Sequence, residues 1–263
     1  MLHFLDTLPL WALGIATVGS CVLFALAASA IAQRRGWTLH PDDIDSATVL
    51  HALVGLVYAV ALGLIAVDVQ QDHTDVKQAV IVEVSALGDL YRGMEGLDAS
   101  VREPLRAQVR TYVRLVIDEE WPSLHKGAPS EATERQLGAL SSRLITMQPQ
   151  APHELLVQRE LFEDLSKATD ARRKRIFMGM SGISVATWMV VILGAMVALV
   201  FAGLFPMRRP HQRAGVGLTA SMFGLMLFLI VATDRPLRGQ MAVGPEAFET
   251  LRGAMQQGEG VPR

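Results

Sequence analysis

Four segments of the sequence contain no Asp, Glu, Lys or Arg, and this feature constrains the fold most. The segments are Thr7–Gln33, Ser46–Val67, Ile176–Met207 and Ala214–Thr233. A bilayer core about 30 Å thick requires roughly 20 apolar residues in a helix, and each segment meets that length. The sequence therefore predicts an all-α integral membrane protein with four spans. We expect the spans at Trp11–Ala32, Thr48–Val67, Val185–Phe205 and Gly215–Thr233.

The composition excludes several other classes of protein. Apolar residues make up 51% of the chain and charged residues 19%, whereas a soluble domain has about 25% charged residues. An ordinary soluble enzyme, a secreted disulfide scaffold and a disordered chain are therefore excluded. The net charge of −2 gives no basic surface for nucleic acid. Cys21 is the single cysteine, so the chain can form no internal disulfide.

The charged residues mark a second region between the second and third spans. Of the 50 charged residues, 32 lie between Asp72 and Arg175. We divide the chain into spans one and two (1–71), a helical extramembrane bundle (72–175), spans three and four (176–238) and a C-terminal tail (239–263). The tail contains a short amphipathic piece at Pro245–Met255.

Apolar residues at helical spacing indicate that two spans extend into this bundle. After the second span, an apolar stripe continues at intervals of three and four residues through Val76, Val80, Val84, Leu87, Tyr91 and Met94. We expect this helix to reach about Gly96, and the third span to begin as a soluble helix near Pro152. Two shorter helices, Ser100–Glu120 and Ser130–Met147, complete the predicted bundle, with Pro122 in the connector.

An even number of spans places both termini on the same side as the bundle. The positive-inside rule does not orient the chain, because both sides carry arginines next to the spans. The short loops contain Arg34, Arg35, Arg208, Arg209 and Arg213. Residues Ala28–Ala30 resemble a signal-peptide cleavage site, but the long apolar core and the arginines that follow it favour an uncleaved span.

Several short patterns, in order along the chain, resemble the bacterial bestrophin-like domain family, a domain of unknown function. The patterns are Gly55-Leu-Val-Tyr58, Glu83 ahead of Leu90-Tyr91-Arg92, Tyr112, Glu120-Trp121-Pro122, Arg172, Trp188 with Gly194, and Asp234-Arg235-Pro236 with Gly239. Together they cover roughly Ala47 to Leu251. Asp68 departs from the family pattern, in which we expect an aromatic residue at the end of the second span.

The resemblance implies a layout and a function. It implies four spans with both termini and the central helical region in the cytoplasm of a bacterium, in a multi-pass inner-membrane protein. It also implies a homo-oligomer that conducts ions, with anions as the class that the family suggests. The lipid bilayer and further copies of the chain are then the expected partners, and the transported ion remains unassigned.

Small residues form a stripe on the second span that includes Gly55, Ala59 and Gly63. Such a stripe lets helices approach closely in lipid. It has two interpretations, which are packing within one subunit and a pore wall or subunit contact. His51 and Asp68 lie near the two ends of this span and are candidates for an ion site, because ionisable groups near membrane depth are often functional.

Further polar residues lie next to the third and fourth spans. Arg172, Arg173, Lys174 and Arg175 precede the third span and are interpreted as a lipid-facing basic collar, or as a ring that attracts anions in an oligomer. Asp234 and Arg235 follow the fourth span and are expected to anchor it at the interface.

The remaining family-pattern residues lie in the bundle or in the third span. We expect intrabundle pairing and packing for Glu83, Tyr91, Arg92, Tyr112, Glu120 and Trp121, with Glu83 facing a base on another helix. Trp188 lies in the third span.

The sequence contains no catalytic motif and no histidine spacing typical of a metal site, so we expect no enzyme, no cofactor and no metal. Two other functions remain as alternatives to a channel. One is a membrane-anchored sensor or scaffold, because long helices could connect a bundle to the membrane. The other is a membrane enzyme, which lacks any visible set of catalytic groups.

Overall fold

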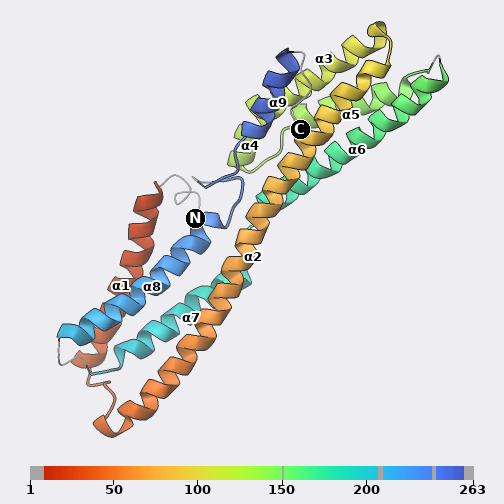
Figure 1. The fold of residues 1–263 in the computed structure, drawn as a ribbon. Helices are drawn as coiled ribbons and strands as arrows, with labels where there is room; N and C mark the ends of the chain where they lie inside the picture. Colours follow the sequence, from red (N-terminus) through yellow and green to blue (C-terminus); the bar gives the residue numbers. More distant parts are fainter. Residues whose placement is uncertain (1–8, 150, 207–209, 239–240, 258–263) are drawn as a thin grey trace. The chain divides into compact units, whose positions relative to one another are not determined.

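In a computed structural model, every regular element of the described chain is a helix or a helical turn (Figure 1). The structure describes residues 9–149, 151–206, 210–238 and 241–257, so Arg208, Arg209 and Gly239 lie outside the described residues. The chain divides into two compact units. The first, which we call the membrane unit, comprises residues up to Gln71, Gly182–Asp234 and Met241. The second, the bundle unit, comprises Asp72–Ser181, Arg235–Arg238 and the residues from Ala242 onward.

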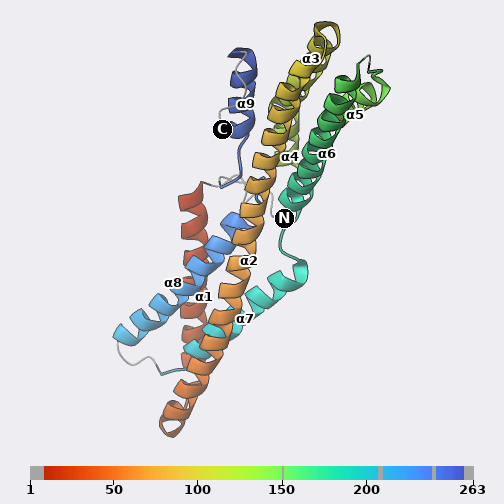
Figure 2. The ribbon, with the colours of Figure 1, turned by 45° about the vertical axis from the view of Figure 1, so that its right-hand side comes forward.

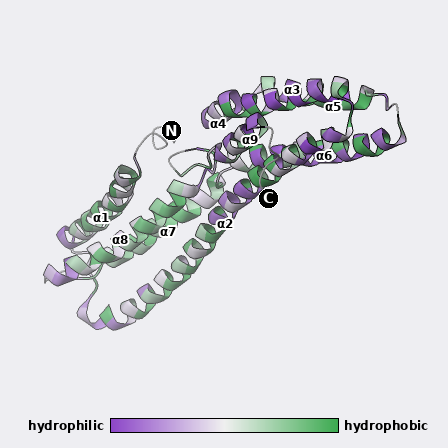
Figure 3. Ribbon diagram, turned by 45° about the horizontal axis from the view of Figure 1, so that its top comes forward, coloured by the Kyte–Doolittle hydropathy of each residue, from purple (hydrophilic) through white to green (hydrophobic). Residues whose placement is uncertain are grey.

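The membrane unit contains α1 (Leu10–Arg34), the first part of α2 (Ile44–Gly93), α7 (Val185–Gly203) and α8 (Pro210–Thr233). A short 3₁₀ turn, η2 (Pro41–Asp43), precedes α2. Four helices of the described chain are long and apolar enough to cross a membrane, which confirms the predicted four-span, all-α class. Figure 3 shows their largely apolar colouring. α1 packs along α8 and α7, and Gly224 of α8 lies against the backbone of Val18.

α2 is unbroken over 50 residues, as the apolar stripe predicts, and ends in the 3₁₀ turn η3 (Met94–Gly96). The helix that precedes the third span behaves differently. α6 (Pro152–Met180) begins where we expect but does not run on into α7, because residues 181–184 are not helical. Ser181 and Ser184 both have extended backbone, and the Ser184 hydroxyl accepts a hydrogen bond from the Thr187 N–H at 3.1 Å. Ser184 therefore starts a new helix as its N-cap.

The bundle unit packs the second part of α2 and α6 against three helices that come from the middle and the end of the chain (Figures 1 and 2). These are α3 (Ala99–Leu115), α5 (Glu131–Thr146) and α9 (Glu246–Gln257). α2 supplies Val76, Leu87 and Leu90, and η3 supplies Met94, to a core completed by Leu105, Val109, Leu140, Leu144, Leu161, Phe248 and Leu251. α5 and α9 match the helices expected at Ser130–Met147 and Pro245–Met255.

The helix predicted at Ser100–Glu120 continues further than we expect. After α3 comes a π-helical turn, η4 (Val116–Glu120), and then α4 (Trp121–Lys126), which ends at Gly127 with φ of 94°. Pro122 is tolerated because it lies in the first turn of α4. Val116 and Glu120, at the two ends of this turn, are both buried, so the chain carries a carboxylate into the core at this point.

Candidate functional site

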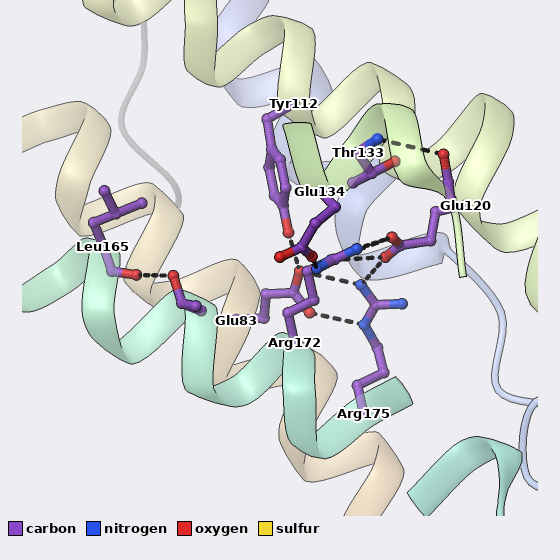
Figure 4. A network of polar contacts seen from close by, with 10 residues as sticks. Glu83, Tyr112, Glu120, Thr133, Glu134, Leu165, Arg172 and Arg175 are labelled. Atoms are coloured by element: carbon purple, nitrogen blue, oxygen red, sulfur yellow. Dashed lines mark hydrogen bonds and ion pairs between the residues drawn. The ribbon is translucent and has the colours of Figure 1, made fainter. Parts of the chain in front are cut away.

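A network of buried charges lies at the centre of the bundle unit, and Figure 4 shows it from close by. Glu83 from α2 and Glu120 from η4 face Arg172 and Arg175 from α6, and all four side chains are buried. Arg175 binds Glu83 through two nitrogens, with Nε 2.7 Å from Oε2 and Nη2 3.1 Å from Oε1. Because a buried ion needs both an opposite charge and hydrogen bonds, this two-point contact is what allows Arg175 to lie in the core.

Glu120 lies between the two arginines and joins them. Its Oε1 lies 2.7 Å from Nη2 of Arg175, and its Oε2 lies 2.6 Å from Nη2 of Arg172. Arg172 also pairs with Glu134, whose side chain is largely exposed on α5. The network therefore connects α2, η4, α5 and α6, with the two buried carboxylates matching the two buried guanidinium groups and Glu134 adding an exposed third acid.

Tyr112 from α3 adds a fifth element to the network. Its hydroxyl donates a hydrogen bond to Oε1 of Glu83 at 2.7 Å. Burial, and then the charge of Glu83, raise the pKa of Tyr112 well above its ordinary value. The phenol therefore remains a hydrogen-bond donor to Glu83 throughout the physiological pH range.

The two arginines remain charged in spite of their burial. Burial alone would lower the pKa of each guanidinium, but the paired carboxylates outweigh it and raise both pKa values. Glu120 has this effect mainly on Arg172, and Glu83 mainly on Arg175. Both guanidinium groups therefore act as permanent charged hydrogen-bond donors to the carboxylates around them.

Aromatic rings cover one side of Arg175. Its guanidinium carbon lies 4.6 Å from the centre of the Trp121 ring and 5.6 Å from that of Phe248. The Trp121 indole N–H donates to the carbonyl of Val243 at 3.0 Å, which fixes the start of α9 on the bundle. A cation lying over aromatic faces gains further stabilisation where water is excluded.

This arrangement corrects one sequence interpretation. A lipid-facing collar of Arg172–Arg175 is wrong for Arg172 and Arg175, which are 3% and 0% exposed. Four consecutive residues of a helix point in four directions about 100° apart, so they cannot share one face. Arg173 and Lys174 do point outward, near Asp170 and Asp75 respectively. The alternative interpretation, a ring that attracts anions, also loses the charges of Arg172 and Arg175, because buried acids neutralise them.

The family-pattern residues of the bundle fall into two groups. Glu83, Tyr112, Glu120 and Trp121 meet around the two arginines, as the expected intrabundle pairing requires. Tyr91 lies elsewhere, with its hydroxyl 2.8 Å from Nη1 of Arg110 and its ring 4.6 Å from the guanidinium carbon of Arg106. Arg92 pairs on the surface with Asp89.

Sequence reasoning missed Glu134 and Phe248 as members of the network. A signal for the buried acids was nevertheless present in the sequence. Glu120 follows Val109, Tyr112, Val113 and Val116 at helical spacing, and Glu83 falls on the apolar stripe of α2. An acid on an apolar stripe must find a buried cation, and this rule points to the partners on α6.

The candidate residues of the membrane unit lie in several different environments. Apart from the adjoining turns of α2 itself, no atom of the described residues lies within 4 Å of the position that a Cβ would occupy at Gly55 or Gly63, and Ala59 and Asp68 are exposed. The His51 ring packs edge-on against Phe201 and Phe205. Trp188 packs against the cluster around Tyr58 and Leu62.

Asp234 serves the membrane unit as a cap. Its carboxylate accepts a hydrogen bond from the Ile183 N–H at 2.6 Å, just before α7 begins. Arg235 is partly buried in the bundle unit. Among the described residues, no group of three or more His, Cys, Asp or Glu side chains could hold a metal ion.

The comparisons with known proteins agree with this fold. A family profile, the Bestrophin-like domain, matches residues 18–248. A crystal structure of a bacterial bestrophin homologue from Klebsiella pneumoniae, carrying one substitution, is similar with a TM-score of 0.70 and 11% identity over 93% of this chain and 98% of that chain. A crystal structure described as a membrane protein is similar with the same TM-score and identity, over 93% and 97%. No curated protein matches this chain.

Proposed function

The chain belongs to the Bestrophin-like family of membrane proteins, and on this premise we propose that it is an oligomeric, channel-like protein that conducts ions, in the first place anions. We place it in the inner membrane of a bacterium, with the bundle unit on the cytoplasmic side. Its buried charges serve to hold the bundle together rather than to catalyse a reaction.

One observation carries the proposal, and it concerns the small residues of the membrane unit. Gly194 and Gly224 are packed against other parts of the same chain. A Cβ at Gly194 would overlap the Tyr58 ring, and a Cβ at Gly224 would overlap the backbone of Val18. Gly55 and Gly63 of α2 have open space instead. Small residues that no other helix of the described chain approaches are available to a second copy or to a pathway.

Several copies of this face of α2 can pack around a common axis because the face lacks bulk. Ala59 lies between Gly55 and Gly63 and is exposed. Asp68 and His51, toward the two ends of the span, then lie near the two mouths of the pathway. Any ion selectivity at the two ends of the pathway then depends on the charges of the side chains there.

A matched pair of tryptophan variants tests this proposal. We expect Ala59→Trp to block flux from proteoliposomes while the oligomer remains intact, because a narrow pathway is sensitive to added volume. Leu218→Trp is the control, since Leu218 is 74% exposed on α8 and a larger side chain there meets only lipid. Anion and cation gradients are tested in parallel, and the oligomeric state is measured by light scattering.

The outcomes separate the two main functions. Equal flux from both variants would remove α2 from the pathway. No flux from the parent under any gradient would favour a sensor or scaffold, for which the unbroken 50-residue helix α2 is the supporting feature.

The orientation is tested separately by thiol labelling in a Cys21→Ser background. Gly138 is a suitable bundle site, because a Cβ there meets no other atom, whereas Gly127 has a positive φ. We expect an impermeant reagent to label His40→Cys and not Gly138→Cys in intact cells. The reverse pattern would invert the topology.

A further inference from the structure

A cavity of about 440 Å³ lies between α3 and α9 of the bundle unit, apart from the buried charge network. Its volume falls within the range of about 300–1,000 Å³ that is typical of small-molecule sites. Three arginines line it, Arg110 and Arg114 from α3 and Arg252 from α9. Thr111 and Gln256 add neutral hydrogen-bonding groups, and Asp118 is the one acid in this lining as far as the structure describes it.

The positive charge of this cavity is only partly neutralised within the described residues. Arg114 is exposed and has no ion pair there, and Arg110 bonds the neutral Tyr91 hydroxyl. Arg252 lies 3.9 Å from Asp118, which is beyond hydrogen-bonding distance. Two other arginines of α3 differ in this respect, because Arg102 and Arg106 both pair with Glu95 at 2.9 and 2.7 Å.

Like charges four residues apart on a helix repel each other, so Arg110 and Arg114 make α3 less stable unless an anion lies between them. Guanidinium groups suit phosphate and carboxylate oxygens because their N–H groups form a planar fork. Arginines on two different helices can then bind two anionic groups of one molecule.

We propose that this cavity binds a small soluble ligand with at least two adjacent anionic groups, either phosphates or carboxylates. The ligand bridges α3 and α9 through Arg114 and Arg252, and the Thr111 hydroxyl and the Gln256 amide complete its hydrogen bonds. Because the ligand holds α9 against α3, its binding stabilises the folded bundle. This site is independent of the proposed ion conduction, and its test involves no flux.

The test uses the full-length protein in detergent, with inorganic pyrophosphate as the probe. Binding is measured by calorimetric titration at low salt. Citrate is titrated in parallel as the carboxylate probe. We expect saturable binding of at least one probe, a higher unfolding temperature when it is bound, and affinity that falls as salt is added. Orthophosphate, with a single anionic group, should bind more weakly than pyrophosphate.

Single-charge variants localise the binding. Arg114→Gln should weaken binding about tenfold, because a hydrogen bond to a charged group is lost. Arg159→Gln removes an equivalent exposed charge from α6, which does not line the cavity, and should leave the affinity unchanged. Arg114 has no ion pair to lose among the described residues, so the variant should retain its fold, and its thermal unfolding without ligand checks this point.

Three results would overturn the proposal. The first would be that neither probe binds the parent protein at millimolar concentration. The second would be that Arg114→Gln and Arg159→Gln both bind the probe as tightly as the parent does. The third would be that nanodiscs of phosphatidylglycerol displace the probe while nanodiscs of phosphatidylcholine do not. That result would assign the cavity to a lipid headgroup instead of a soluble ligand.

Discussion

The two parts of α2 use the same kind of residue in opposite ways. In the membrane unit, apolar side chains such as Leu53 and Leu64 are more than half exposed, and burial is confined mainly to a stripe that includes Tyr58 and Leu62. In the bundle unit, Val76, Leu87 and Leu90 are fully buried. One continuous helix therefore passes from a region where apolar residues need no protein partner to one where they need several.

The surrounding medium accounts for this difference. Lipid is as apolar as leucine, so an exposed leucine in a membrane costs little, and helices there associate through small residues and close packing. In water the same leucine must be covered, because its exposure costs about 25 cal/mol per Å². The charges follow the opposite rule, since the four charged side chains at the centre of the bundle unit, Glu83, Glu120, Arg172 and Arg175, are buried as mutually paired groups.

The largest effect is expected where two acids of α2 are compared. Glu83→Leu should lower the free energy of unfolding by about 3–5 kcal/mol, because Arg175 loses its two-point partner and the two buried guanidinium groups must then share Glu120 as their buried carboxylate. Asp68→Leu, at an exposed position, should change it by about 0.5 kcal/mol or less. Denaturant unfolding in detergent measures both, and equal losses would contradict the contrast between the two parts of the helix.

Two leucines of α2 provide an apolar version of the same comparison. Leu90 is 0% and Leu64 is 68% exposed. Leu90→Ala should cost about 3 kcal/mol, since it opens a cavity in the bundle core, whereas Leu64→Ala should be nearly neutral. Thermal unfolding of the two purified variants checks this, and a large loss for Leu64→Ala would mean that protein, not lipid, covers that position.

Two glycines test which small residues of the membrane unit are packed within the chain. Gly194→Ala should destabilise the protein by about 1–3 kcal/mol, because its Cβ would overlap the Tyr58 ring. Gly63→Ala has free space and should be neutral or gain up to about 1 kcal/mol of helix stability. A loss of oligomer, but not of thermal stability, in Gly63→Ala would identify that position as a subunit contact.

The smallest effect concerns Tyr112 and depends on pH. Tyr112→Phe removes a hydrogen bond to Glu83 and should cost about 1–2 kcal/mol at neutral pH. Because the pKa of Tyr112 is raised in the folded protein, its contribution is complete below about pH 10 and is lost as the pH rises further. The stability difference between parent and variant should therefore shrink above that pH, and a constant difference up to pH 12 would contradict this linkage.

Much of the fold could be predicted because it follows from local patterns. The four spans follow from the absence of charge, and the unbroken α2 follows from the apolar stripe that continues past the second span at helical spacing. The break at residues 181–184 could not be predicted in this way, since it depends on serine side chains that cap a new helix. The extension to Lys126 was missed because Pro122 can either end a helix or occupy its first turn.

The candidate site was predicted only in part. The sequence identified Glu83, Tyr112, Glu120 and Trp121 as one set of bundle residues, and the structure brings them together. It gave Arg172 and Arg175 two interpretations, a lipid-facing collar and a ring that attracts anions, and both expose these side chains, because a run of bases beside a span is usually exposed. The partners of these arginines come from segments as many as 92 residues away, and no local pattern reports such a pairing.

The π-helical turn at Val116–Glu120 has a consequence for evolutionary comparison. A π turn contains one residue more than the α turn that it replaces, so it is the natural record of a single-residue insertion in an ancestral helix. Relatives that lack the insertion should show a one-residue gap here when aligned by structure. At 11% identity a sequence alignment is prone to miss that gap and to pair Glu120 with the wrong neighbour. Superposed structures, rather than sequence alignments, therefore identify the distant relatives that retain the buried carboxylate.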